Sequence, residues 1–452
     1  MESMNENEPT NAARPEPSTQ TGGGVGVHPS SADNASYADS EEVESSYFKR
    51  TFSSLANIEF RFLWIGSLLT MGAMQMQTFA RGFFVYDLTD SGLLLGVVSA
   101  GAGAPGLILS LYGGVLVDRL EKKRIIQTCQ VAFTILSLII AILILTDNII
   151  WQHLLVASFI HGSIMPFMMP ARQAIVPQVV AKEKIMNASA LNSLAMSVMS
   201  MLAPALAGGF SAWIGMANLY FIITGLYIAS WMVTGKLSRH VAVASRTGKS
   251  ALSDIAQGFS YVRKDNVIFL LLIMGFVQVM MMAPIRFVMP IFAKDVFMVS
   301  EFGLGWLLGL MGAGSLVGAL IIAGMSKIKR RGYLLIVSGV LSGIVLIGFS
   351  ALSEFVPLFL PALVFMVIIG AIQSGRMTLQ NSLTLEYVEP AYRGRVMAIQ
   401  GLTWGLMPIG VLPLTIIADH WGAPVGLALL ASAFIVISAL MLAFSPKMRA
   451  LQ

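Results

Sequence analysis

The chain has 452 residues, of which 56% are hydrophobic and only 12% are charged, whereas a soluble domain carries about 25% charged residues. Its mean hydropathy is +0.75, and its single cysteine, Cys129, gives no basis for a disulfide framework or a cysteine-held metal ion. These values exclude a soluble enzyme and indicate a polytopic membrane protein for which we expect no metal and no cofactor.

The N-terminal segment 1–46 holds nine acidic side chains and one basic one, Arg14, and is rich in Gly, Ser, Pro and Asn. We expect it to be a disordered acidic tail in the cytoplasm, because it has too few apolar residues to form a core. It lacks a basic stretch followed by an apolar one, so it is not a cleaved signal peptide. Residues 47–61 are predicted to form an amphipathic segment at the membrane interface.

Twelve apolar stretches follow, each long enough to cross the hydrocarbon core as a helix, which takes about 20 residues. They form two sets of six, because one long polar segment interrupts the series. We therefore predict an all-α membrane protein with a six-helix bundle at 62–235, a central cytoplasmic loop at 236–266, a second six-helix bundle at 267–444 and a cytoplasmic tail at 445–452. The predicted spans are 62–86, 92–117, 125–145, 152–172, 187–211, 217–235, 267–291, 304–325, 333–352, 357–377, 397–418 and 424–444.

Basic residues are distributed unevenly between the loops that connect these spans. If the N-terminus is inside, the inner loops and tails hold nearly all of the bases, and the outer loops hold only Lys294. Bases accumulate in cytoplasmic loops, so both termini are predicted to be cytoplasmic and the chain to lie in the plasma (inner) membrane. The net charge of +5 is then explained by the membrane surface, and nucleic acid is not an expected partner.

The two sets of spans resemble each other. The tripeptide GAG occurs at 101–103 in the second span and at 312–314 in the eighth, and a short basic loop follows each of these spans. Arg81 and Arg286 lie at the same depth, roughly 19 residues into the first and the seventh span. Paired six-helix halves with a binding site near the midplane are typical of secondary transporters.

The segment GGVLVDRLEKKR at 113–124 resembles the loop motif between the second and third helices of the major facilitator superfamily. The matching residues are Gly114, Asp118, Arg119, Lys122 and Lys123. Four further stretches, 170–193, 202–209, 393–398 and 405–414, are similar to the branch that contains macrolide-efflux proteins and the enterobactin exporter. The resemblance implies two pseudo-symmetric bundles around a central cavity and a gating role for the loop motif. The alternative to a gating role is that the lysines only add to the positive charge of the inner face.

Charged and polar side chains inside the spans are the best indication of a substrate cavity, because burying them in a membrane is costly. Arg81 and Arg286 are candidates for holding an anionic or carboxylate-bearing substrate. Gln75, Gln77 and Gln278 add polar groups to the same two helices. Arginines that extend to the outer headgroups, and glutamines that bond to neighbouring helices, are the alternatives.

Two residues are candidates for carrying a coupling proton. His161 lies near the middle of the fourth span and can titrate near neutral pH, although a packing role explains a lone histidine equally well. No Asp or Glu lies well inside any span, so Asp87, in the loop after the first span, is the second candidate.

Proline and glycine occur together in the fifth and eleventh spans. Pro204 with Gly208, and Pro408 with Gly410, are predicted to bend these helices and let neighbours approach closely. The first pair lies in LAPALAGG, which resembles the fifth-helix motif of antiporters, and ordinary helix packing is the alternative.

The sequence thus predicts a secondary transporter that works by alternating access as a monomer in the lipid bilayer. We expect it to export a small amphipathic or anionic molecule, drug-like or siderophore-like, with an ion gradient as the driving force, and the resemblance implies that the ion is a proton. An importer or a lipid or solute transporter on the same fold is the alternative, because the gradient sets the direction of such a machine.

Overall fold

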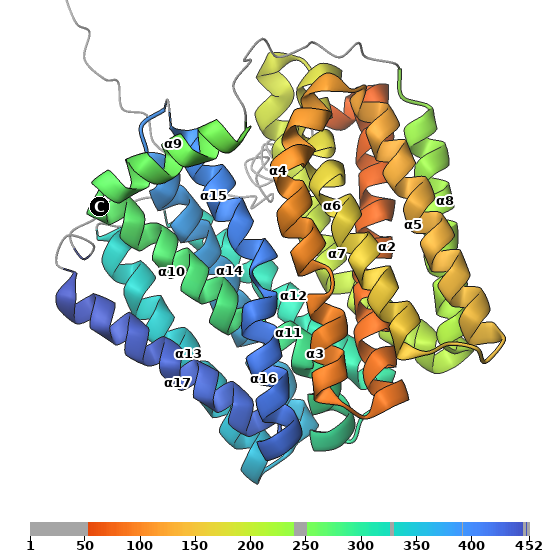
Figure 1. Ribbon diagram of the computed structural model, residues 1–452, viewed down its shortest axis with the longest axis vertical. Helices are drawn as coiled ribbons and strands as arrows, with labels where there is room; N and C mark the ends of the chain where they lie inside the picture. Colours follow the sequence, from red (N-terminus) through yellow and green to blue (C-terminus); the bar gives the residue numbers. More distant parts are fainter. Residues whose placement is uncertain (1–52, 239–250, 326–329, 391, 446–448, 450–452) are drawn as a thin grey trace, which may run out of the picture. The chain divides into compact units, whose positions relative to one another are not determined.

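The computed structural model of the chain describes residues 53–238, 251–325, 330–390, 392–445 and 449 (Figure 1). Within these ranges, the side chains of residues 111, 112, 114, 115, 118, 119, 251–256, 323, 404 and 408 are not described. The predicted tail at 1–46, the first part of the interfacial segment and most of the tail at 445–452 lie outside the described residues. Every regular element in the described ranges is helical, which confirms the all-α prediction.

The first half of the chain contains seven α-helices in the described residues. They are α2 (Ile58–Thr89), α3 (Gly92–Ala100), α4 (Gly103–Arg119), α5 (Lys122–Leu145), α6 (Trp151–Val179), α7 (Ile185–Ile214) and α8 (Met216–Gly235), with short 3-10 turns η1 (Ser53–Ala56) and η2 (Lys182–Lys184). Helices α3 and α4 form one span that is interrupted at residues 101 and 102.

The second half begins with α9, which lies within the predicted central loop. Its helices are α9 (Ala251–Lys264), α10 (Asn266–Met282), α11 (Ile285–Ile291), the π-helix η3 (Phe292–Val296), α12 (Glu301–Gly324), α13 (Arg331–Phe355), α14 (Phe359–Tyr387), α15 (Arg393–Gly405), α16 (Pro408–Trp421) and α17 (Ala423–Phe444). The seventh predicted span is broken between α10 and α11, and the eleventh is broken between α15 and α16.

Ten helical segments in the described residues are long and apolar enough to cross a membrane. The other two predicted spans, 62–86 and 397–418, correspond to α2 and to the broken pair α15–α16. Of that pair, residues Ile409–Trp421 form a shorter apolar helix. The structure therefore confirms a multi-span helical protein, and the number twelve stays a prediction.

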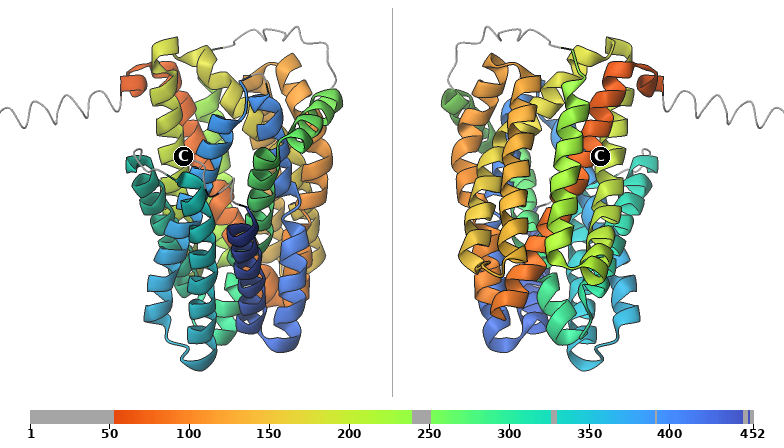
Figure 2. Two further views of the ribbon diagram at one scale, coloured as in Figure 1. Left: turned by 90° about the vertical axis from the view of Figure 1, so that its left-hand side faces the viewer. Right: turned by 90° about the vertical axis from the view of Figure 1, so that its right-hand side faces the viewer.

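Helix contacts occur both within and between the two predicted halves. In the first half α2 packs against α7 and α8, and α5 packs against α6 and α8. In the second half α12 packs against α14, and α13 packs against α14 and α17. The halves meet where α7 packs on α12 and where α3 packs on α16. Figure 2 shows the long helices side by side, and α9 lies across the ends of α10 and α15.

The start of α2 is set by a side-chain cap. The Asn57 side chain accepts hydrogen bonds from the backbone N–H groups of Glu59 and Phe60, which have no partner within the helix. Its amide group donates to the carbonyl of Val179 at the end of α6 (2.9 Å). Residues 58–61, which the sequence analysis placed in the interfacial segment, are therefore the first turn of α2.

The α7–α12 contact depends on small residues. A Cβ atom added to Gly208 would lie 2.8 Å from the Cα atom of Gly305, and one added to Gly312 would lie 2.6 Å from the Cα atom of Met201. The two backbones thus approach too closely for any side chain at these positions. Pro204 and Gly208 lie in this contact, so the predicted motif of the fifth span joins the two halves.

A buried amide links three helices of the first half. The Gln130 side chain on α5 donates toward the hydroxyl groups of Thr70 on α2 and of Ser230 and Thr234 on α8, at 3.2, 2.7 and 3.1 Å. Gln130 is fully buried. Polar groups in a membrane must find their partners inside the protein.

We predict that Gln130→Met, which keeps the volume and removes the amide, lowers the stability of the detergent-solubilised protein by about 1–2 kcal/mol. Thermal unfolding measures the change as a lower midpoint temperature. The matched control is Gln152→Met, because Gln152 is exposed on α6. Equal midpoints for the two variants would contradict the structural role of Gln130.

Candidate functional site

The residues of the loop motif lie where α4 ends and α5 begins. Gly114, Asp118 and Arg119 belong to the last turns of α4, and their side chains lie outside the description. Lys122 is buried at the start of α5. Lys123 donates to the carbonyl groups of residues 235 (2.8 Å) and 237 at the end of α8. The two lysines are thus anchored within the first half, and the gating role of the motif stays a prediction.

Three predicted site residues come together in one buried cluster of the first half. Arg81 on α2 is 7% exposed and lies within electrostatic range of Tyr220 and Tyr227 on α8 and of His161 on α6. Gln77 accepts a hydrogen bond from the hydroxyl of Tyr227 (2.9 Å). The cluster therefore brings a candidate substrate residue next to a candidate proton carrier.

The aromatic ring of Phe133 packs against this cluster. Phe133 on α5 lies 5.0 Å from the ring of His161 and 5.3 Å from the ring of Tyr227. The Nη1 atom of Arg81 and the Nδ1 atom of His161 are buried and have no hydrogen-bond partner among the described residues. Free hydrogen-bonding capacity in a buried place is costly, so this cluster is a polar site held inside one half.

Arg286 lies in a different setting from Arg81. It is on the first turn of α11, just after the helix break at Ala283 and Pro284, and its side chain is exposed. No hydrogen bond or ion pair of its side chain occurs among the described residues. The two arginines therefore lie at matched positions of the two halves, but only Arg286 opens to a solvent-accessible space.

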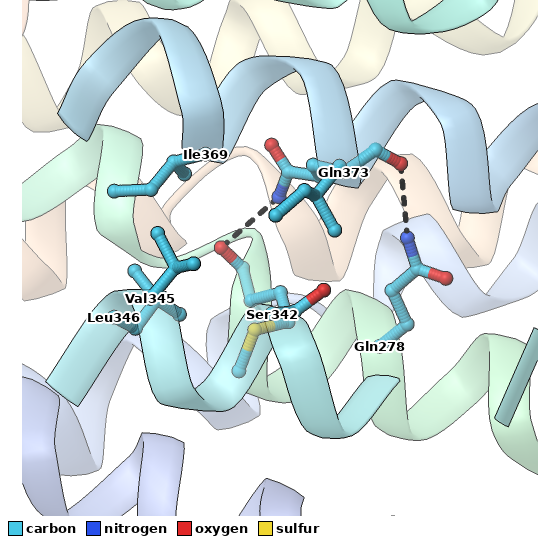
Figure 3. Close-up of a pocket in the computed structure, with 8 residues that line it drawn as sticks. Gln278, Ser342, Val345, Leu346, Ile369 and Gln373 are labelled. Atoms are coloured by element: carbon cyan, nitrogen blue, oxygen red, sulfur yellow. Dashed lines mark hydrogen bonds between the residues drawn. The ribbon is translucent and has the colours of Figure 1, made fainter. Parts of the chain in front are cut away.

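Gln278 lines a pocket inside the second half (Figure 3). It is a small pocket between α10, α13 and α14. It is lined by Gln278, Met282, Ser342, Val345, Leu346, Ile369, Ile372 and Gln373. Gln278 donates to the carbonyl of Gln373 (3.4 Å), and Gln373 donates to the carbonyl of Met282 (3.2 Å).

The bond to Met282 follows from the helix break. The N–H of Arg286 bonds to the carbonyl of Ala283 and not to that of Met282, so the Met282 carbonyl is free to accept from Gln373. Gly410 on α16 lies directly against the carbonyl of Met280, whose usual helix partner at position 284 is a proline without an N–H. Gly410 and Gln373 thus cover the carbonyl groups that the break exposes, while Pro408 begins α16.

Sequence reasoning missed a polar contact that joins the two halves, which we call the latch. Lys294 of η3 forms ion pairs with Asp87 (3.1 Å) and Asp90 (2.8 Å) at the end of α2. The hydroxyl of Tyr86 on α2 donates to the carboxylate of Asp295, beside Lys294. Asp87, the second candidate for proton coupling, is therefore part of an ion pair between the halves.

The latch also contains a helix cap shared between the halves. Asp419 at the end of α16 accepts hydrogen bonds from the backbone N–H groups of Gly92 and Leu93 (2.8 Å for Leu93) and from the hydroxyl of Ser91 (3.2 Å). These groups form the first turn of α3, where N–H groups lack partners and the helix dipole attracts an anion. One signal was present in the sequence, namely a single lysine among aspartates in the predicted outer loops.

Two glycines of α3 allow α16 to approach it closely at the latch. A Cβ atom added to Gly92 would lie 2.6 Å from a carboxylate oxygen of Asp419, and one added to Gly96 would overlap the side chain of Thr415. Gly92 and Gly96 are four residues apart and so lie on one face of α3. The spacing G-x-x-x-G in SGLLLG was the signal for this close contact between α3 and α16.

Two further buried arginines were not among the predicted site residues. Arg172 on α6 donates to the carbonyl groups of Gly66 (3.1 Å) and Ser67 (3.3 Å) on α2. Arg376 on α14 is 2% exposed and lies over the ring of Phe434, 4.8 Å from its centre. Both arginines lie near the predicted ends of their spans, so sequence position alone indicated interfacial anchors.

Comparisons with known proteins agree with this architecture. The sequence pattern of the family described as transmembrane secretion effector, within the major facilitator superfamily, matches residues 49–452. Macrolide efflux protein A of Streptococcus pyogenes is 24% identical over 375 residues, which cover 81% of this chain and 90% of that protein. The enterobactin exporter of Shigella boydii is 22% identical over 342 residues, which cover 75% and 79% of the two chains.

Solved structures show the same fold at lower identity. A variant of the nucleoside transporter NupG superimposes with a TM-score of 0.71 at 14% identity, covering 85% of this chain and 99% of the other. The match to the family extends over almost the whole chain and includes all the helices described above. The chain therefore belongs to the transmembrane secretion effector family of the major facilitator superfamily and is a multi-pass membrane transporter.

Proposed function

We propose that the chain is a secondary active exporter that works by alternating access. The observation that carries the proposal is the latch, because its partners come from both halves and lie at one end of the bundle. A transporter of two rocking halves needs contacts that close one end and can be released. The latch contributes such contacts, since it adds ion pairs and a helix cap to the close packing of α3 on α16.

The end opposite the latch carries α9, which contacts α4 of the first half. Helices α4 and α15 are in contact at Leu107 and Gly405, where an added Cβ atom would lie 3.1 Å from the Leu107 side chain. One turn further toward α9, a Cβ atom on Gly401 would meet nothing within 4 Å. The free surface of α15 at Gly401, between these two contacts, supports access from the α9 end.

The positive-inside rule gives this arrangement an orientation. Lys294 is the single base in the predicted outer loops, and it lies in the latch. The latch then faces outward, and the α9 end and both termini face the cytoplasm. With twelve spans, counting α2 and α15–α16, this orientation would place the uptake of a molecule on the side of the cytoplasm or the inner leaflet.

Export is favoured over import by the relatives. Macrolide efflux protein A and the enterobactin exporter are named for outward transport, and both match most of this chain. An importer on the same fold is the alternative, but none of the observations above favours it. The substrate we propose is a small amphipathic or anionic molecule.

We propose protons as the coupling ion, with the latch acids as the point of entry. Asp87 and Asp90 hold Lys294 across the halves, so loss of their negative charge would release the latch. His161 is the other candidate, but it lies in a closed cluster beside Arg81. Entry at the latch links proton binding directly to opening.

The first test is the release of the latch by mutation. An exposed ion pair and a helix cap each contribute about 1 kcal/mol, so Lys294→Gln together with Asp419→Ala shifts the equilibrium toward the outward-open state by roughly tenfold or more. A cysteine at Thr78, half-buried on α2, reports the opening in a Cys129→Ser background. We expect an impermeant thiol reagent to label it in intact cells faster in the double variant.

The matched control for this test is Glu354→Gln, which neutralises an exposed acid at the end of α13. We expect it to leave the labelling rate unchanged. If the double variant and this control label at the same slow rate, the latch does not hold the outward side closed and the proposal fails.

The second test concerns the proton. Labelling of the cysteine at Thr78, normalised to that of the unfolded protein, should rise as the external pH falls, because the proposed coupling proton binds from outside and opens the outward side. In the Asp87→Asn, Asp90→Asn double variant the rate should be high and independent of pH. If the pH dependence persists in this variant and disappears in His161→Gln, the coupling role belongs to His161 and not to the latch acids.

A further inference from the structure

Arg286 is the single exposed residue on an otherwise enclosed helix. Ile285, Val288 and Met289 are at most 1% exposed, and Pro290 and Ile291 are also buried. The helix α11 contacts α2 and α3 of the first half and α12, α16 and α17 of the second. An exposed side chain on a helix surrounded in this way opens to a space inside the bundle.

The pattern of burial excludes a lipid-facing position for Arg286. On a helix, residues three and four positions away lie on the same face. Within α11, Met289 and Pro290 occupy those positions, and both are buried. A face turned to lipid would be exposed along several turns, so the Arg286 guanidinium lies in a local opening and is not extended to the headgroups.

Polar side chains of α2 line the same space. A Cβ atom on Gly82 of α2 would lie 3.8 Å from Pro290 of α11, so these helices touch there. Thr78 and Gln75 continue the same face of α2 by one and two turns, and both are half-buried. Arg286 lies one turn before Pro290, at the level of Thr78, because both helices run toward the latch.

We propose that Arg286, with the amide of Gln75, recognises the anionic group of the transported molecule, so that the substrate is a small organic anion. The guanidinium has no ion pair among the described residues, and a carboxylate would supply two oxygen atoms in the geometry that arginine prefers. Arg81 does not share this role, because tyrosines and His161 enclose it in the first half.

The position of Arg286 explains how such a ligand takes part in transport. Arg286 belongs to the second half and Gln75 to the first, so one anionic group held by both residues spans the two halves. A ligand can shift a conformational equilibrium only through contacts that differ between the states. Contacts from both halves have this property, because rocking changes their distance.

The experiment uses three probes that share one aromatic ring system and differ in charge, namely naphthoate, naphthalenemethanol and naphthylmethylammonium. Calorimetric titration of the purified full-length protein measures their affinities. We expect naphthoate to bind at least tenfold more tightly than the other two. Arg286→Gln should weaken naphthoate by tenfold or more and leave the neutral probe unchanged, and Arg286→Lys should retain part of the preference.

Lys182→Gln, which removes an exposed base in η2, is the charge-matched control and should behave like the wild type. If Arg286→Gln does not fold, Gln75→Leu tests the same site and should weaken naphthoate severalfold. The proposal is overturned if the wild type prefers the neutral or cationic probe, if it binds none of the three, or if the preference for naphthoate survives in Arg286→Gln. The inference rests on the proposed export function, but thiol labelling across the latch needs no ligand, so the two can fail separately.

Discussion

The carboxylate of Asp419 caps a helix of the opposite half, and this contact positions the other polar groups between the halves. To reach the first turn of α3, α16 must lie against Gly92 and Gly96, where no side chain intervenes. The end of α11 and η3 then lies beside the end of α2, which brings Lys294 to Asp87 and Asp90. The same arrangement encloses α11 between the halves and leaves Arg286 facing an internal space.

Within each half, a side chain of a long helix binds the backbone of the first span. Arg172 on α6 donates to the carbonyl of Gly66, and Gln380 on α14 donates to the carbonyl of Leu271 (2.6 Å). Both side chains are the twenty-second residue of a 29-residue helix. A membrane offers no water to such groups, so these contacts hold each half together, whereas the charged contacts of the latch join one half to the other.

The fold could be predicted largely from the sequence, because a long apolar stretch in a membrane satisfies its backbone hydrogen bonds by forming a helix. The spans, the division into two halves and the all-helical class depend on composition and length alone. The breaks at residues 283 and 406 were harder to predict, because proline often occurs in membrane helices without breaking them. The helix α9 lies in a segment that resembles an ordinary polar loop.

The candidate site was predictable only in part. The free-energy cost of placing polar side chains in a membrane identified four residues as unusual, namely Arg81, Arg286, Gln77 and His161. This cost alone does not distinguish an arginine packed among tyrosines from an arginine that faces a cavity. That distinction depends on which neighbours surround each turn. The latch was missed because its aspartates lie at span edges, where exposed acids are common, and because a helix N-terminus attracts an anion without any side-chain signature. The two glycines of α3 were the clearest indication.

Two spin-label distances in one protein test the central claim most directly, in a Cys129→Ser background. The first joins Leu88 and Trp421, both exposed, across the latch. The second joins Leu120, exposed at the end of α4, and Gly394 on α15, around which the structure is open. Alternating access predicts that Asp419→Ala lengthens the first distance and shortens the second. Two distances that stay unchanged, or that lengthen together, would contradict a rocking mechanism controlled by the latch.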